Sequence, residues 1–345
     1  MLEKVSLIIP TKNRHIYLTR ILEYYQNSEL DIIVADASET PYNKSIPSNC
    51  SYYHYPNIAY CEKLKDVFKK VQSCYSLLCA DDDFITLNAI SQCVSFLDKN
   101  PTYSSVQGNY IFYKYSRKKI FYTPAYVMTI GVDIKDDLPT QRIDRYTKLP
   151  IQLYYSLHRT DTFRYIFNNA NESIKNLNLV ELLIGYCSLI KGKHMVLPIF
   201  YSVRELLYGS AGKSDRIDTI STTQKYKQEF HSFVIIVSKL LKQNERNDSM
   251  DYSHVIQSSI KKLTKHRLQK SPSKSEKLGR IAKKIFPFNI RKVLHHYTLL
   301  LTKNKRAFSN NKFALQNKGF PLKESEENKE IKRIESLILR HNIIQ

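Results

Sequence analysis

The chain lacks the sequence features of membrane-spanning and secreted proteins. No apolar run in its 345 residues approaches the roughly 18 to 20 residues that cross a bilayer. The N-terminal sequence enters VSLIIP directly, without the basic region and cleavage site of a secretory leader. We therefore expect a protein that is made and kept in the cytoplasm.

Glycine and cysteine patterns exclude further classes of site. Only eight glycines occur, and they form no glycine-rich phosphate loop, which argues against an activated triphosphate site. The six cysteines have no CxxC spacing, which argues against a zinc site and a disulfide framework. We expect these residues to be reduced and mostly buried: Cys50, Cys61, Cys74, Cys79, Cys93 and Cys187.

Composition and charge divide the chain into two parts. Hydrophobic residues make up 42% and charged residues 25%, which is typical of a globular protein. The net charge is +21, but the stretch from Val255 to Phe320 contains 17 Lys or Arg against one acidic residue, Glu276. The chain before this stretch, which we call the body, is only mildly basic. We predict one domain over residues 1–243 and a basic, mainly helical region over 244–345, with the boundary in the polar stretch NERNDSMD.

In the body, short apolar runs alternate with stretches whose apolar residues recur at helical spacing. VSLIIP predicts a strand at 5–10, the sequence after it predicts a helix, and DIIVADASE predicts a second strand. The pattern repeats through a short strand near 52–55, a helix over 57–73 and the run YSLLCA at 75–80. Strand, helix, strand is the pattern of a parallel α/β sheet with right-handed crossovers. The stretch 131–150 shows no clean period and predicts a long loop or short helices.

Three consecutive aspartates, Asp81 to Asp83, follow the strand YSLLCA. In open α/β sheets, ligands bind beyond the carboxyl ends of the strands, where Thr11, Arg14 and Asp36 also fall. Clustered carboxylates suit a hard cation, which prefers oxygen ligands. The alternative is an ordinary cap of the following helix, although like charges at this density are costly without a counter-ion.

Four stretches carry a resemblance to a known family: VSLIIPTKNR, DIIVADASE, CADDDF and the later helix VELLIGYCSLIKGK. The chain resembles a family 2-type glycosyltransferase over roughly residues 1 to 235. The resemblance implies the GT-A fold, a Rossmann-like nucleotide-binding sheet with flanking helices. CADDDF would supply the DxD motif, with Asp81 and Asp83 as metal ligands for Mn²⁺ or Mg²⁺, or Asp82 and Asp83 in the other frame. The remaining donor-binding residues implied are Pro10, Thr11, Arg14, Asp36 and Lys63.

The resemblance also implies a general base at the start of the later helix. Glu181 is the carboxylate available there, beside Val180 where the family usually has a second acidic residue. Our hypothesis is that Glu181 takes the proton of the acceptor hydroxyl in an inverting, single displacement. The alternative is a solvated glutamate in the first turns of a helix. Arg204 and Glu205, just beyond a strand, could contact diphosphate or acceptor, or form an ordinary ion pair.

The function implied is transfer of a sugar from a nucleotide donor, with UDP preferred as the nucleotide, to a saccharide or lipid-linked acceptor in surface polysaccharide synthesis. Two alternatives remain at this point. One is a nucleotidyltransferase on a related fold, and the other is an inactive glycosyltransferase-like adaptor that binds membrane or nucleic acid.

Three interpretations of the basic C-terminal region are open. Leu278, Ile281 and Ile285 share a helical face opposite Arg280, Lys283 and Lys284, a pattern of helices that lie on an anionic membrane. Such a protein would sit peripherally on the inner face of the membrane. The apolar faces could instead pack on the body, and nucleic acid is the least favoured partner because no recognised motif accompanies the charge. Residues 320 to 345 predict one further charged helix.

Overall fold

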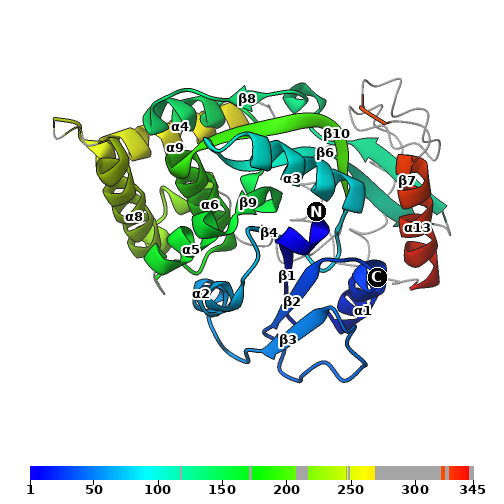
Figure 1. The fold of residues 1–345 in the computed structure, drawn as a ribbon. Helices are drawn as coiled ribbons and strands as arrows, with labels where there is room; N and C mark the ends of the chain where they lie inside the picture. Colours follow the sequence, from blue (N-terminus) through cyan, green and yellow to red (C-terminus); the bar gives the residue numbers. More distant parts are fainter. Residues whose placement is uncertain are drawn as a thin grey trace, which may run out of the picture.

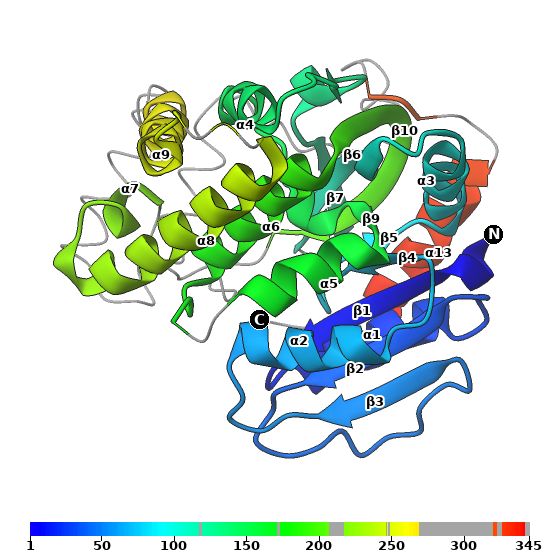
Figure 2. The same cartoon turned by 60° about the vertical axis from the view of Figure 1, so that its left-hand side comes forward.

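The computed structural model describes residues 1–116, 119–170, 173–206, 217–245, 247, 249–268, 320–322 and 326–341. In these residues the chain forms a central mixed sheet with helices on both faces (Figures 1 and 2). Within the same residues, no helix is long and apolar enough to cross a membrane.

The strands of the sheet follow the order β3-β2-β1-β4-β9-β6-β10-β5, with β7 beside β6 and β8 beside β10. Their bounds are β1 (Val5–Thr11), β2 (Asp31–Asp36), β3 (Cys50–His54), β4 (Tyr75–Leu78), β5 (Phe84–Ile85), β6 (Tyr103–Ser116), β7 (Lys119–Pro124), β8 (Asp133–Ile134), β9 (Leu157–Arg159) and β10 (Lys193–Glu205). Strands β3, β2, β1 and β4 are parallel, which confirms the predicted strand, helix, strand pattern.

Two helical layers cover the sheet. One layer contains α2 (Tyr60–Lys70), α4 (Pro139–Thr147), α5 (Thr160–Asn169), α6 (Leu177–Lys191), α8 (Lys227–Glu245) and α9 (Tyr252–Leu268). The other contains α1 (His15–Tyr25), α3 (Leu87–Lys99) and α13 (Glu326–Arg340). The short helical elements are η1 (Leu2–Lys4), η2 (Val127–Thr129), η3 (Leu153–Tyr155), α7 (Ile217–Ile220) and η5 (Gln224–Tyr226).

Strand periodicity explains why both faces need a cover. Successive side chains of a strand point to opposite faces, so a strand buried on both sides is continuously apolar. In β1, Leu7 and Ile9 join the apolar cluster under α1 and α3, whereas Ile8 joins the cluster under α2 and α6. Apart from Ser6, the run VSLIIP is therefore apolar, because each face of β1 meets a different helical layer.

Two helices of the C-terminal part, α9 and α13, pack on the rest of the protein. Helix α9 lies beyond the predicted boundary, and its buried Tyr252, Ile256 and Ile260 belong to the same apolar cluster as α6 and α8. Helix α13 confirms the predicted helix in 320–345, and it packs beside α1 (Figure 1). The predicted amphipathic helices around 278–297 lie outside the described residues, and the division at residue 244 stays a prediction.

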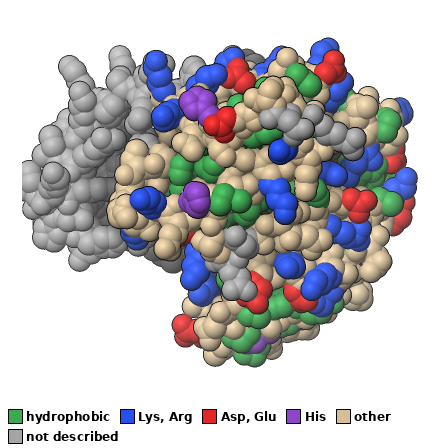
Figure 3. All heavy atoms as spheres, turned by 90° about the vertical axis from the view of Figure 1, so that its left-hand side faces the viewer, with side chains coloured by type: hydrophobic (Ala, Val, Ile, Leu, Met, Phe, Trp, Pro, Cys, Tyr) green, Lys and Arg blue, Asp and Glu red, His purple; other side chains and the backbone are tan. Residues whose placement is uncertain are grey.

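The molecule has a mixed outer surface on the side that carries α5 and α8. Figure 3 shows Lys and Arg side chains there among acidic and apolar ones. On α8, Lys227, Lys239 and Lys242 are exposed, whereas the exposed Ile235 stands between them. This face therefore resembles an ordinary solvated surface with a basic bias.

Two histidines are sealed in the core between the sheet and α6. His158 contacts the carbonyl of Ser156 through Nδ1 at 2.8 Å and the hydroxyl of Ser188 through Nε2 at 2.9 Å. His194 contacts Ser105 through Nδ1, and its Nε2 has no hydrogen bond in the described part of the chain. Burial lowers the pKa of each imidazole to about 3, and for His194 the nearby His158 adds to the effect. Both rings are therefore held neutral.

This burial predicts acid-sensitive folding. Below the ordinary histidine pKa of about 6.5, the unfolded chain takes up protons that the fold excludes, so stability falls by about 1.4 kcal/mol per pH unit for each histidine. We expect the variant His194→Leu to lose less stability than the wild type between pH 7 and pH 5 in urea denaturation. The exposed His254→Gln should keep the wild-type dependence. Equal slopes for wild type and His194→Leu would contradict the assignment.

Candidate functional site

Three strands end side by side at the carboxyl edge of the sheet. Thr11 at the end of β1 pairs in register with Asp36 at the end of β2, and β4 runs parallel to β1 on its other side. The aspartates follow β4 directly, so the topology brings together the residues predicted for the donor site. Pro10 also lies here, half-buried and opposite Ala35 in the β1–β2 register.

Arg14 joins two of the aspartates. Its guanidinium lies 3.0 Å from Oδ1 of Asp81 and 2.8 Å from Oδ2 of Asp82. The hydroxyl of Thr11 donates to Oδ2 of Asp81 at 2.6 Å. Arg14 comes from the turn between β1 and α1, where Asn13 adopts a positive φ of 54°. The sequence PTKNR therefore places one cation over the aspartate loop.

Asp83 is held from the other side of the site by β10. Arg204 donates through Nε to Oδ2 of Asp83 at 3.0 Å, and the backbone N–H of Glu205 donates to Oδ1 at 3.0 Å. The Arg204 guanidinium also lies 4.0 Å from the centre of the Tyr155 ring and donates to Gln152. Of the two readings left open for Arg204, the structure shows an ion pair, and its partner is the aspartate cluster itself.

Burial makes the carboxylates of Asp81 and Asp83 harder to ionise. It raises the pKa of Asp81 to about 7, to which the charge of Asp82 adds and which Arg14 opposes. Burial likewise raises the pKa of Asp83 to about 7, although Arg204 opposes the rise. The arginines therefore do not fully balance the cluster, and further positive charge at this site would stabilise the ionised form.

The aspartates fit a cation that is shared with a substrate. Within the described residues, no group of three or more His, Cys, Asp or Glu side chains is arranged to hold a metal. Asp81 and Asp83 each have two hydrogen-bonding or ionic partners, and Asp82 has one at Oδ2, so all three keep carboxylate lone pairs. Mg²⁺ and similar ions are commonly bound by one or two carboxylates together with substrate phosphates.

Asp36 is fully engaged by the protein. Its Oδ1 accepts from the backbone and the hydroxyl of Ser38, and its Oδ2 lies 2.8 Å from both the Tyr52 hydroxyl and the His15 ring. Burial tends to raise the pKa of Asp36, but these hydrogen bonds outweigh it and lower the pKa. Asp36 thus orients His15 and Tyr52, which the sequence did not single out, and its predicted contact with a base or ribose stays a prediction.

Lys63 lies beneath the same edge. Its side chain is buried on α2, and Nζ donates to the carbonyl of Ala35 at 2.9 Å. Burial lowers the pKa of this ammonium to about 8, while Asp36 and Asp81 oppose the shift. Lys63 therefore lies near Asp36 and Asp81, but its hydrogen bond to Ala35 serves the strand. Its predicted role in donor binding stays a prediction.

Glu181 lies on α6 next to the short helix η3. Its charge acts on both Tyr154 and Tyr155, the two tyrosines of that helix. Tyr155 in turn packs on Arg204, and the Tyr154 hydroxyl is hydrogen-bonded to that of Tyr60. Glu181 therefore lies near Tyr155, whose ring packs on Arg204, the partner of Asp83.

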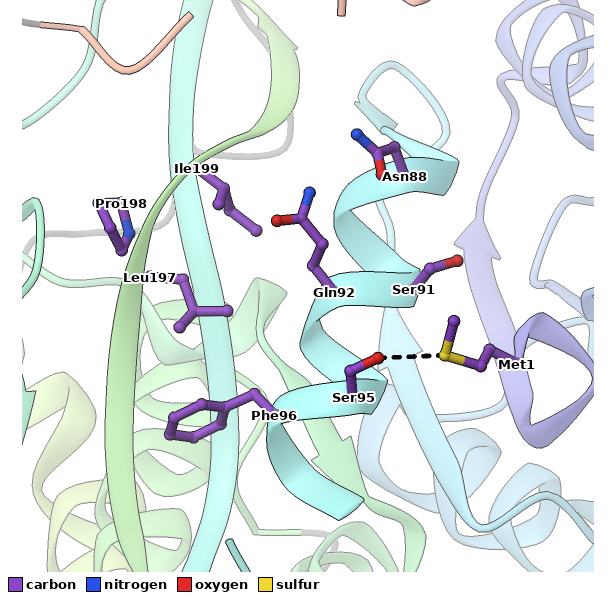
Figure 4. A pocket seen from close by; sticks show the side chains of 9 residues that line it. All are labelled: Met1, Asn88, Ser91, Gln92, Ser95, Phe96, Leu197, Pro198 and Ile199. Atoms are coloured by element: carbon purple, nitrogen blue, oxygen red, sulfur yellow. Dashed lines mark hydrogen bonds between the residues drawn. The ribbon is translucent and has the colours of Figure 1, made fainter. Parts of the chain in front are cut away.

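A separate cavity of about 410 Å³ lies between α3 and β10 (Figure 4). The figure shows Asn88, Ser91 and Gln92 on one side and Leu197 and Ile199 on the other. Its lining contains no Asp, Glu, His, Lys or Arg side chain. The cavity therefore offers no acidic or basic side chain, and the aspartate cluster remains the candidate site.

The sheet order and the charged carboxyl edge define an α/β protein with a GT-A-like glycosyltransferase fold. Among solved structures, S. aureus TarS 1-349 is similar with a TM-score of 0.52 and 10% identity, over 98% of this chain and 89% of that chain. The complex of S. aureus TarS 1-349 with UDP-GlcNAc is similar with a TM-score of 0.51 and 12% identity, over 79% and 75%. No protein-family model and no curated protein matches the sequence.

Proposed function

We propose that this protein is a metal-dependent, inverting glycosyltransferase of the family 2 type. The observation that carries the proposal is the aspartate cluster at the carboxyl edge of a GT-A-like sheet, held there by Arg14 and Arg204. Glu181 lies near Tyr155, whose ring packs on Arg204. One region then contains both a site for a charged donor and a carboxylate for the acceptor. A helix cap alone would not require arginine partners on two sides of the aspartates.

The donor is a nucleotide sugar, with UDP as its nucleotide. Support comes from the similar structure of S. aureus TarS, which was solved in complex with UDP-GlcNAc. Thr11, Arg14 and the three aspartates would face the diphosphate, while His15 and Tyr52 near Asp36 would lie toward the base. Arg14 offers a bidentate fork that suits phosphate oxygens as well as carboxylates.

Asp81, Asp82 and Asp83 would hold Mg²⁺ or Mn²⁺ together with the diphosphate. When bound, the ion supplies positive charge that stabilises the departing nucleoside diphosphate. Arg204 holds Asp83 in position and favours its ionised form, against the effect of burial. Glu181 would accept the proton of the acceptor hydroxyl as that oxygen attacks the anomeric carbon. Tyr154 and Tyr155 lie near this carboxylate.

A turnover assay tests the proposed function directly. The wild type is mixed with a panel of nucleotide sugars, with Mn²⁺ or Mg²⁺, and with saccharide and lipid-linked acceptors, and the release of nucleoside diphosphate is followed. We expect release from a UDP-sugar that needs metal and is stimulated by one acceptor class. The absence of release from every donor in the panel by a folded protein would count against the proposal.

The acceptor is a saccharide or lipid-linked molecule of surface polysaccharide synthesis, as the family resemblance implies. The basic region would hold the enzyme on the inner face of the membrane. The support is the charge pattern around 278–297, which lies outside the described residues.

We expect the full chain to float with anionic vesicles but not with neutral ones, and less so at high salt because the attraction is screened. Replacing Arg280, Lys283 and Lys284 by Glu should reduce flotation, since each basic side chain near such a surface contributes about 1 kcal/mol. Replacing the α8 lysines Lys227, Lys239 and Lys242 by Glu is the matched control. Equal flotation with neutral vesicles, or equal losses in both triple variants, would contradict the assignment to 278–297.

A further inference from the structure

Helix α13 forms part of the layer next to the aspartate loop. Figures 1 and 2 show it beside α1, far from α9. Its apolar residues are buried in the same cluster as α1 and α3: Ile331, Ile334, Leu337 and Ile338. The spacing of these residues places them on one face of the helix, so α13 is docked by a full apolar stripe rather than by a few surface contacts.

One side chain of α13 reaches the start of α3. Helix α3 begins at Leu87, four positions after Asp83, and its N-cap Thr86 makes no side-chain capping bond. Glu330 supplies the cap: its carboxylate accepts from the backbone N–H of Leu87 at 2.6 Å and from that of Asn88. A carboxylate at a helix N-terminus satisfies otherwise unpaired donors and is favoured by the helix dipole.

Glu330 also fixes the aspartate loop through α1. The Tyr24 hydroxyl donates to Glu330 at 3.1 Å, and the Tyr24 ring packs edge-on against Phe84, 5.3 Å between ring centres. The neighbouring Tyr25 hydroxyl bonds both the N–H and the carbonyl of Ile85, at 2.9 Å each. Residues 84–88 are therefore held by one network, directly after the last aspartate.

The same short segment pairs with β10. Phe84 and Ile85 form β5, which pairs with Val203 and Ser202 immediately before Arg204. A shift of residues 84–88 would thus move Asp83 and disturb its alignment with Arg204 at once.

We propose that Glu330 is a positioning residue of the donor site: by capping α3 it fixes the segment that carries Asp83. This inference rests on the proposed function, because it concerns the geometry of the same site. Glu330 touches neither donor nor acceptor; it acts through the backbone of Leu87.

Three variants separate positioning from general stability. Glu330→Ala removes the cap, Glu330→Gln keeps an oxygen that can accept from Leu87, and Glu335→Ala removes another α13 contact, a 2.8 Å hydrogen bond from Tyr122. Each full-length variant is titrated with UDP and Mn²⁺ by calorimetry, its melting temperature is recorded, and amide hydrogen exchange is measured over residues 84–90.

We expect Glu330→Ala to weaken UDP binding by about tenfold, in the range of a lost helix cap, and to speed exchange at residues 84–90. Glu330→Gln should recover most of the affinity. Glu335→Ala should lower the melting temperature similarly and leave UDP affinity and exchange at 84–90 unchanged.

Wild-type affinity in Glu330→Ala, or equal losses of affinity in Glu330→Ala and Glu335→Ala, would overturn the positioning role. So would unchanged exchange at residues 84–90 in Glu330→Ala. If the folded wild type binds no nucleotide at all, the proposed function fails, and the exchange measurement still reports whether Glu330 fixes the loop.

Discussion

Glu181→Gln should lower the rate of sugar transfer by about 10²- to 10⁴-fold, the usual contribution of a general base. The amide keeps the size of the side chain and its place beside Tyr154 and Tyr155, but it cannot take the acceptor proton. Donor KM should change little, because the role proposed for Glu181 concerns the acceptor and not the donor. The measurement is initial velocity with saturating donor and acceptor.

A second Glu→Gln variant controls for the chemistry of the change. Glu62 is exposed in the first turn of α2, and Glu62→Gln should transfer sugar at the wild-type rate. If Glu181→Gln retained most of the wild-type rate, Glu181 would be a solvated helix residue, and the base would have to be sought elsewhere.

Asp83→Ala should be the most destabilising single change in the site. It would leave Arg204 buried against Tyr155 without its carboxylate and the N–H of Glu205 without its acceptor. Breaking a buried ion pair from one side typically costs about 3 to 5 kcal/mol. We expect a loss of this size in the free energy of unfolding by urea, accompanied by loss of nucleotide binding at temperatures where the variant is folded.

The matched control removes an aspartate from a surface pair. Asp161 is paired with Arg164 but its side chain is 87% exposed, so Asp161→Ala should cost less than about 1 kcal/mol. Similar losses in Asp83→Ala and Asp161→Ala would show that the Asp83–Arg204 pair does not hold the loop.

Most of the parallel part of the fold could be predicted because three of its four strands are short, mainly apolar runs. VSLIIP, DIIVAD and YSLL are buried on both faces, and such runs are recognisable in the sequence. Strand β9 was not predicted, because it has only three residues, Leu157 to Arg159, and two of them are polar. For residues 131–150 the sequence predicted a long loop or short helices, and the structure has the short helix α4 there.

The site likewise contains residues that the sequence could predict and residues that it could not. Thr11, Arg14 and the aspartates follow strands that lie side by side, so local sequence was enough to group them. Arg204 remained ambiguous because its partner Asp83 lies 121 positions earlier. Glu330 was not singled out at all, since it caps α3 from 243 positions away, and a glutamate in a charged helix carries no local sign of that role.

The central claim is that the aspartates bind a cation together with a nucleoside diphosphate. Its most direct test is calorimetric titration of a panel of nucleoside diphosphates into the wild type and Asp82→Asn, with and without Mn²⁺. Asp82 is suitable because its loss leaves both Asp81–Arg14 and Asp83–Arg204 in place. We predict tight binding of UDP that requires Mn²⁺ and is weakened at least about tenfold in Asp82→Asn, as expected for a lost charged ligand. Binding of no nucleotide by the folded wild type, or binding indifferent to both Mn²⁺ and the variant, would contradict the account.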